Sequence, residues 1–242
     1  KMADTGPCGP CSEIFWDKGP EFGADGGPAH GDDERFIEIW NLVFMQFEQH
    51  ADGSMTPLPA PSIDTGLGLE RILSVLEGVD SVWETDEFRQ LLDRISELSG
   101  VDHGSSERTD VSQRILADHA RSSTFLISDG VFPSNEDRGY VLRRIIRRAV
   151  RHAWLLGVED LIMPELVDAV VAIMGPDYPE LERNHGFVRD VLSREEQRFR
   201  ETLRTGSAIL DDALDGLGDD GVLSGDVVFK LHDTYGFPLE LT

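Results

Sequence analysis

An extended run and a helix meet at Pro61-Ser62-Ile63-Asp64-Thr65-Gly66-Leu67-Gly68-Leu69-Glu70-Arg71, with two glycines at the junction. Gly66 and Gly68 let a ligand approach the backbone where a Cβ would block it. The free N–H groups of a helix start attract anions, and Arg71 adds a planar cationic fork that suits phosphate. Asp64 offers the opposite charge, which suits an ammonium group. The segment therefore predicts a site where an amino acid meets a nucleotide.

The preceding extended run also carries polar groups among apolar ones. Arg35–Phe47 is predicted to be a strand by its β-branched and aromatic residues. Glu38 and Asn41 interrupt its apolar pattern. Polar residues in such a run usually face solvent or a sheet edge, but they also act as ligand groups in mostly apolar pockets. A strand, a glycine-rich turn and a helix occur in many folds without a ligand, so both interpretations stay open from these residues alone.

The two extended runs are predicted to pair with each other. Asp52-Gly53 is a typical hairpin turn, so Arg35–Phe47 and Met55–Ile63 are expected to be neighbouring antiparallel strands. Proline cannot donate to a ladder of backbone hydrogen bonds. The prolines at 57, 59 and 61 therefore confine the second run to an edge of the sheet or to an irregular approach.

Size and charge limit the possible function classes. The chain has 242 residues, of which 40% are hydrophobic, enough for one large or two small domains. Its formal net charge of -24 argues against a generic nucleic-acid binder, although a local basic face is compatible with it. No apolar run is long enough to cross a bilayer, and Lys1-Met2-Ala3-Asp4 is no signal peptide. We therefore expect a soluble, cytoplasmic protein without a membrane partner.

The two cysteines, Cys8 and Cys11, exclude a disulfide framework. Their Cys-x-x-Cys spacing also occurs in zinc and redox sites. A structural zinc site needs four ligands, and neither a second cysteine pair nor a spaced histidine pair lies nearby. Gly9 and Pro10 inside the motif argue against a thioredoxin-like helix start. No metal site is expected here.

The pattern changes near Trp83–Asp86, where strand signals give way to helical periodicity. We expect an α+β protein with two domains, 1–84 and 85–242, the second all-helical. A long helix over Phe187–Leu214 is expected to carry Glu195, Glu196 and Arg198 on its exterior. The other helices and the surface loops are predicted at Phe88–Leu98, Ser112–Ile127 and Leu161–Met174, and at Lys18–Asp33 and Gly216–Gly225.

Apolar pairs and arginine pairs alternate every four residues along Val141–His152. On a helix this spacing gives one apolar stripe and one basic stripe. Most charged stripes are solvated faces with no partner. Here every charged position is an arginine, and no acid stands at i+4 within the run to pair with it. In so acidic a chain this favours a surface that binds a phosphate backbone.

Taken together, these segments resemble the class II aminoacyl-tRNA synthetases, and among them the alanyl-tRNA synthetases. Gly-Leu-Gly-Leu-Glu-Arg at 66–71 is similar to the third signature motif of the class. Asp4–Glu13, Arg35–Phe47 and Val227–Leu239 also match that family in order, so the resemblance covers essentially the whole chain. It implies the end of an antiparallel-sheet catalytic domain followed by an all-helical domain that recognises the tRNA acceptor stem.

The resemblance implies an alanine–tRNA ligase, which joins alanine to ATP and then transfers the alanyl group to the 3′ end of its tRNA. By resemblance, the alanine pocket consists of Trp40, Asn41, Val43, Asp64 and Gly66. The ATP site consists of Glu38, Ile39, Gly68 and Arg71, with Mg²⁺ expected beside the phosphates. No side chain is expected to act as a nucleophile, and the zinc of the full-length family is not expected in this segment.

The family also reads a G·U pair in the acceptor stem of its tRNA. Its reading residues match Asn135 and Asp233. A carboxylate can accept a hydrogen bond from the exocyclic amino group of guanine in the minor groove, and an amide can donate or accept. Asn and Asp are equally common as turn or capping residues, which is the alternative for both. Further tRNA contacts are expected from Arg138, Arg143, Arg144, Arg147, Arg148 and Arg151.

The chain departs from the family pattern in one respect: the first and second signature motifs and the editing region have no counterpart in it. We therefore expect this chain alone to form no adenylate. A second hypothesis is a binding module that docks an acceptor stem without catalysis. A third is a helical scaffold with no RNA role.

Overall fold

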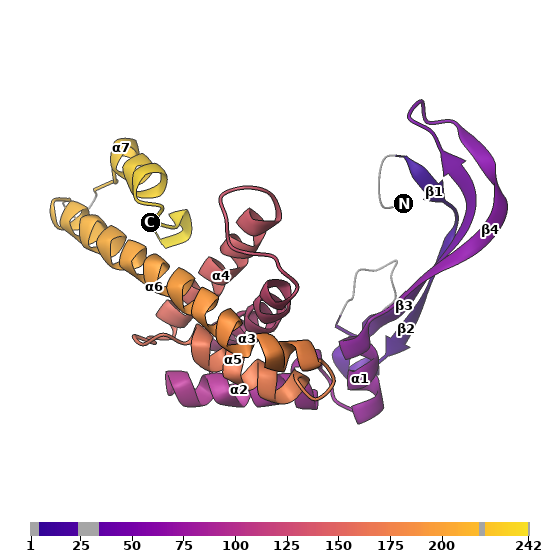
Figure 1. The fold of residues 1–242 in the computed structure, drawn as a ribbon, viewed down its shortest axis with the longest axis horizontal. Coiled ribbons are helices and arrows are strands. Elements are labelled where there is room, and N and C mark those ends of the chain that lie inside the picture. The colour runs from indigo at the N-terminus through magenta and orange to yellow at the C-terminus, as the bar shows by residue number, and fades with distance from the viewer. Residues whose placement is uncertain (1–4, 24–33, 218–220, 242) are drawn as a thin grey trace. The chain divides into compact units, whose positions relative to one another are not determined.

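The computed structural model describes residues 5–23, 34–217 and 221–241 (Figure 1). The chain divides into two compact units, Lys1–Phe88 and Arg89–Thr242. The first unit holds an antiparallel sheet and the second is built from helices, so the expected α+β class is confirmed. The loops predicted at Lys18–Asp33 and Gly216–Gly225 lie partly outside the described residues.

One long strand organises the sheet of the first unit. This strand is β3 (Phe36–Gln49), and β4 (Met55–Leu67) pairs with it antiparallel along one side. On its other side β3 pairs with β1 (Gly6–Cys8) and β2 (Cys11–Asp17). The predicted hairpin and the edge position of the proline-rich strand are therefore confirmed among the described residues.

The junction between β4 and the next helix differs from the expected glycine-rich turn. β4 continues to Leu67, so Asp64 and Gly66 lie within a paired strand. Backbone pairing with β3 keeps this segment extended. Gly68 is the N-cap of α1 (Leu69–Glu77), and Arg71 lies in its first turn.

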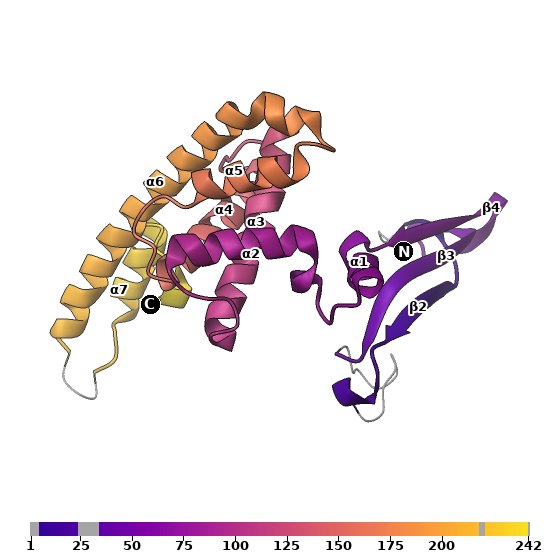
Figure 2. The ribbon, with the colours of Figure 1, turned by 90° about the horizontal axis from the view of Figure 1, so that it is seen from below.

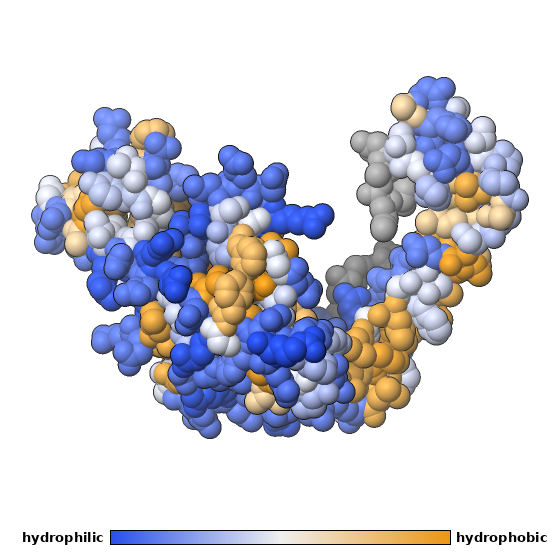
Figure 3. All heavy atoms as spheres, in the orientation of Figure 1, coloured by the Kyte–Doolittle hydropathy of each residue, from blue (hydrophilic) through white to orange (hydrophobic). Residues whose placement is uncertain are grey.

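The apolar face of α1 is largely uncovered. Leu69 and Leu76 are 66% and 76% exposed, and Ile63 on β4 is 56% exposed. Figure 3 shows the resulting apolar patch over α1 and the adjoining strands. In a soluble monomer apolar patches of this kind are uncommon and mark surfaces that meet another element.

The second unit packs its helices around α3 and α6 (Figure 2). α3 contacts α4, α5 and α6, and α6 also contacts α4 and α5. Leu116, Ile146, Leu166 and Leu192 are completely buried between them. The helices are α2 (Asp86–Ser99), α3 (Glu107–Ser128), α4 (Asp137–Leu155), α5 (Met163–Met174), α6 (Pro179–Asp215) and α7 (Gly225–Phe229), which a π-helical turn (Lys230–Thr234) extends.

Two acids expected on the exterior of α6 are in fact buried. Glu195 is 4% exposed and Glu196 is completely buried, so that prediction is wrong, whereas Arg198 is exposed as expected. Glu196 accepts hydrogen bonds from the backbone N–H groups of Ile162 and Met163 at the start of α5, at 3.1 and 2.8 Å. It also pairs with Arg200 at 2.8 Å. Burial raises the pKa of Glu196, and these partners oppose that rise.

His152 on α4 is a buried, neutral histidine. It is 7% exposed, and its Nδ1 lies 3.0 Å from the hydroxyl of Ser112 on α3. Burial is the largest cause that lowers its pKa, and together with the nearby charges of Arg151, Arg148 and His119 it brings the pKa from 6.5 to about 4. At neutral pH its imidazole therefore packs uncharged.

This histidine predicts a pH-dependent stability. Because its folded pKa lies below its unfolded value, stability is present above pH 6.5 and is lost as the pH falls toward about 4. Between pH 7 and pH 5 the parent chain should lose about 2 kcal/mol more unfolding free energy than His152→Gln. Urea unfolding followed by helix circular dichroism measures this difference. His185→Gln, which alters a half-exposed histidine on α6, is the control, and equal pH dependence in all three chains would contradict the prediction.

Candidate functional site

The register of β3 and β4 collects the predicted alanine residues on one face of the sheet. Val43 lies opposite Asp64, and Asn41 lies opposite Gly66. Directly opposed residues share a face, and side chains alternate along a strand. Trp40 therefore lies on the other face, opposite Leu67. The structure brings together four of the five predicted alanine residues and separates Trp40 from them.

The amide of Asn41 is held by β2. Its Nδ2 lies 3.1 Å from Cys11 Sγ and 3.2 Å from Glu13 Oε1. An amide nitrogen donates, so these contacts fix its orientation and leave Oδ1 as an acceptor on the face that carries Asp64. A carboxylate and an amide oxygen on one face suit an ammonium group.

The loop between β1 and β2 approaches the sheet very closely. A Cβ at Gly9 would lie 1.7 Å from the backbone oxygen of Phe44 on β3. Only glycine fits there, and Phe44 N–H donates to Pro10 O at 2.9 Å beside it. The Gly-Pro segment between the cysteines therefore serves to place Cys11 and β2 on the sheet.

The predicted ATP residues gather where α1 meets β3. Gly68 N–H donates to Ile39 O at 3.2 Å, and Arg71 Nη1 donates to the backbone oxygen of Glu38 at 2.7 Å. Arg71 is exposed, and its guanidinium has further N–H donors for phosphate oxygens. These contacts hold an arginine and a helix N-terminus at one end of the strand pair.

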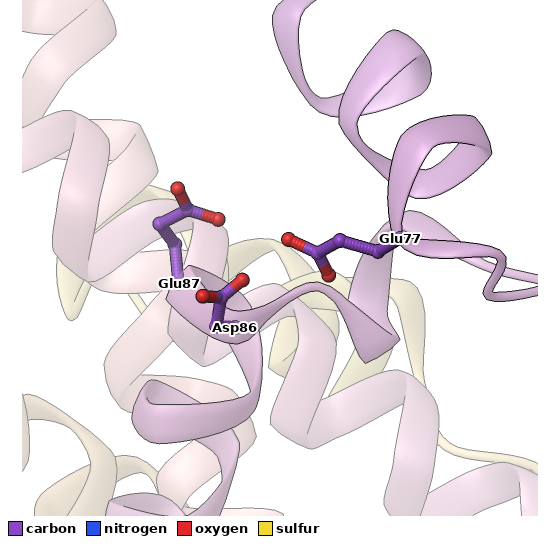
Figure 4. Close-up of side chains that lie close together, drawn as sticks. All are labelled: Glu77, Asp86 and Glu87. Carbon is purple, nitrogen blue, oxygen red and sulfur yellow. The ribbon is translucent and has the colours of Figure 1, made fainter.

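Three carboxylates could hold a metal ion elsewhere in the first unit (Figure 4). One ligand oxygen from each of Glu77, Asp86 and Glu87 lies within 4.8 Å of the others. The hydrogen bond from Asp86, with smaller effects of burial and charge, raises the pKa of Glu77. No further feature of the described residues points to a metal there.

In the second unit, the arginine helix α4 lines a basic groove of about 790 Å³. The wall from α4 includes Arg144, Arg147, Arg148 and Arg151. Its described lining includes no Asp or Glu, which makes it a local exception in an acidic chain. The other lining residues are His119, Tyr140, Val141, Ile145, Phe199, His232, Gly236, Phe237, Pro238 and Leu239.

The arginines of α4 divide into two sets. Arg143 and Arg147 lie with Nε 3.0 and 3.2 Å from the same oxygen of Glu195 on α6. Arg144 and Arg148 are exposed. The sequence offered no acid within the run, but α6 supplies one through the tertiary fold. Arg147 both pairs with Glu195 and lines the groove.

The two predicted G·U-reading residues lie in different local settings of this unit. Asn135 and Arg138 are exposed and line an open hollow of about 910 Å³ formed by residues 129–139. Asp233 is exposed in the π-helical turn near the C-terminus. That turn is anchored because Phe237 packs against α6 at Gly206, where a Cβ would lie 2.0 Å from the ring.

Comparison with known proteins gives the family. The model of the family described as tRNA synthetases class II (A) matches residues 1–242. The chain belongs to this family. It is 55% identical over 244 residues to an alanine–tRNA ligase of Halorhodospira halophila and 57% identical over 245 residues to one of Parvibaculum lavamentivorans. All of the chain is covered in both cases, but it spans only 28% and 27% of the length of these relatives.

Within this class II synthetase chain, two residues of the candidate site were missed from the sequence. Cys11 and Glu13 hold the Asn41 amide, yet from the sequence Cys11 was considered only as a disulfide, metal or redox residue, and Glu13 was given no role at the site. Alternation along β2 places both on one face, and only the register with β3 sets Glu13 opposite Asn41. None of the described helices combines the length and apolar character that a bilayer crossing requires.

Proposed function

We propose that this chain supplies the alanine-activating and acceptor-stem-binding parts of an alanine–tRNA ligase. In the first step the alanine carboxylate attacks the α-phosphate of ATP, and pyrophosphate leaves. In the second step a hydroxyl of the 3′-terminal ribose of tRNA attacks the alanyl carbonyl, and AMP leaves. The observation that carries the proposal is the pairing of Val43 with Asp64 and of Asn41 with Gly66 on one sheet face.

Asp64 binds the alanine ammonium in this proposal, and Asn41 Oδ1 accepts a second hydrogen bond from it. Val43 and Gly66 line the space for a methyl side chain. None of these residues is a nucleophile. The rate enhancement comes from positioning the two substrates and from charge placed near the reacting phosphate.

The nucleotide end is served by Arg71 and the N-terminus of α1. Arg71 neutralises developing charge on the phosphates, while its bond to Glu38 O fixes its position. Mg²⁺ commonly binds through one or two carboxylates together with substrate phosphates. Glu38 is the carboxylate of the predicted ATP set, so the residues present fit an ion carried by ATP, which would offset phosphate charge.

The RNA end is served by the basic groove and by Asn135 and Asp233. Arg144 and Arg148 contact the phosphate backbone, and the two reading residues contact the G·U pair in the minor groove. A binding module without catalysis would use the same surface. Asp64→Ala separates the two functions in a whole enzyme that contains this chain, where it should abolish alanine activation if the chain serves catalysis, while RNA affinity stays intact under either function.

A segment exchange tests the ligase proposal. Replacing the matching segment of the Halorhodospira halophila enzyme with this chain should preserve alanylation, because 55% of those positions are identical. In that chimera Asp64→Asn should raise the KM for alanine about 10- to 100-fold, since the hydrogen bond to the ammonium loses the negative charge of its acceptor. The KM for ATP is the internal control. An unchanged KM for alanine would contradict the role of Asp64.

The chain by itself is expected to be inactive in adenylate formation. The apolar face of α1 and β4 is uncovered, and Arg71 is the one arginine of the predicted ATP set. Alanine-dependent exchange of pyrophosphate into ATP measures this directly. Exchange above the level of Arg71→Met would contradict the prediction.

Arginines of the groove should govern a salt-dependent RNA affinity. Arg144→Met and Arg148→Met should each weaken binding of an acceptor-stem hairpin and lower the slope of log K against log salt by about 1. Arg194→Met removes the same charge from an exposed arginine of α6 that does not line the groove, and it should leave the slope unchanged. Affinity that is absent or independent of salt would favour a scaffold without an RNA role.

A further inference from the structure

We propose that Arg143 is a positioning residue which turns the Asn135 amide so that its NH₂ group, not its oxygen, faces the RNA. Buried Glu195 in turn holds Arg143. This inference rests on the proposed function and deepens it, because it changes what Asn135 can read. It also removes Arg143 from the set of phosphate-binding arginines.

We call the chain of contacts from Glu195 through Arg143 to Asn135 the relay. Its first contact joins α4 to the loop that precedes this helix. Arg143 Nη1 donates to Asn135 Oδ1, and Nη2 donates to the backbone oxygen of Pro133 at 3.3 Å. A guanidinium has donors only, so the atom it meets on Asn135 must be the carbonyl oxygen. The Nδ2 group is then left as the outward pole of an exposed side chain.

The second contact fixes the guanidinium itself. Arg143 Nε lies 3.0 Å from Glu195 Oε1 in an ion pair that lacks the geometry of a hydrogen bond. The side chain of Glu195 is only 5% exposed and that of Arg143 is 18% exposed. Arg147 Nε donates to the same oxygen at 3.2 Å, so the carboxylate is fixed from two sides. All three nitrogens of Arg143 are thus engaged within the protein.

The relay gives the two reading residues opposite hydrogen-bonding roles. Asp233 is an acceptor and suits the guanine amino group. Asn135 with its oxygen engaged is a donor, which suits the acceptors of the minor groove, such as a purine N3 or a pyrimidine O2. Sequence alone allowed the amide either role. The contact with Arg143 selects one.

The test measures hairpin binding by the chain in its parent form and in Asn135→Ala, Arg143→Lys and the double variant. Hairpins carry G·U or G·C at the reading position, and dissociation constants are taken across a salt series. Arg143→Lys keeps the charge beside Glu195 but lacks the fork that reaches Asn135 at the same time. It should reduce the G·U preference about five- to tenfold, as much as Asn135→Ala, with the salt slope unchanged. The double variant should be no worse than either single one.

Three further measurements separate this role from a merely structural one. Asn135→Asp removes the donor and should lose as much preference as Asn135→Ala. A hairpin with inosine in place of guanine lacks the amino group, so it should lose its dependence on Asp233 and keep its dependence on Asn135. Glu195→Gln, which keeps the shape, should weaken the preference as well. Binding is measured where each variant retains the helix signal of the parent chain.

The outcomes distinguish a failure of the relay from a failure of the proposed G·U reading by Asn135. No G·U preference in the parent chain, or none that depends on Asn135, overturns the relay together with the assignment of Asn135. A preference that Asn135→Ala abolishes and Arg143→Lys leaves intact overturns the relay alone. A salt slope that Arg143→Met lowers as much as Arg144→Met does would return Arg143 to the phosphate-binding set, because only the methionine variant removes the charge.

Discussion

Two adjacent buried carboxylates on α6 set the arrangement of the helical unit. Glu196 accepts the first backbone N–H groups of α5 and pairs with Arg200, while Glu195 pairs with Arg143 and Arg147 of α4. A buried charge is tolerated only when partners compensate it, and removing one partner costs about 3–5 kcal/mol. These pairs therefore fix how α4 and α5 are rotated about their axes and where each lies along α6, as well as the fact that they touch it. Apolar packing alone would leave more freedom.

The same pairs divide the arginines of α4 by task. Those that Glu195 draws inward lose freedom and act on the fold, and Arg143 also reaches the loop that carries Asn135. Arg144 and Arg148 stay exposed along the groove, which Arg147 also lines although it pairs with Glu195. A single helix thus presents one set of arginines held by Glu195 and one exposed set, and Arg147 also lines the groove with the second. A regular spacing of arginines in the sequence does not distinguish between the two sets, because the acid that sorts them lies about 50 residues further along the chain.

The sequence predicted the helices and strands well, but it did not predict which side chains contact each other across the fold. Periodicity located the helices, and Asp52-Gly53 with the prolines of β4 predicted the hairpin and its edge. The exterior assignment of Glu195 and Glu196 failed because a helical pattern shows which residues share a face and not which face meets another helix. Trp40 was grouped with Asn41 by the family resemblance, whereas strand alternation and register place the two residues on opposite faces of the sheet. A shift of one residue in that register would exchange the two faces, so no local signal could have replaced the observed pairing.

The net charge of the chain and the local charge of the groove beside α4 have opposite signs. A chain with a formal charge of -24 repels a polyanion over most of its surface. The described lining of the groove beside α4 includes four arginines and two histidines and no acid, so this groove attracts a polyanion locally. Outside the groove, acidic side chains repel the phosphates of an RNA, which disfavours binding at other places. In the proposed function this repulsion orients the RNA without any contact to a base. In the proposed function, Asn135 and Asp233 are needed only to discriminate the base pair after the groove has bound the backbone. For that proposed task, a donor and an acceptor held in place contribute more than additional positive charge.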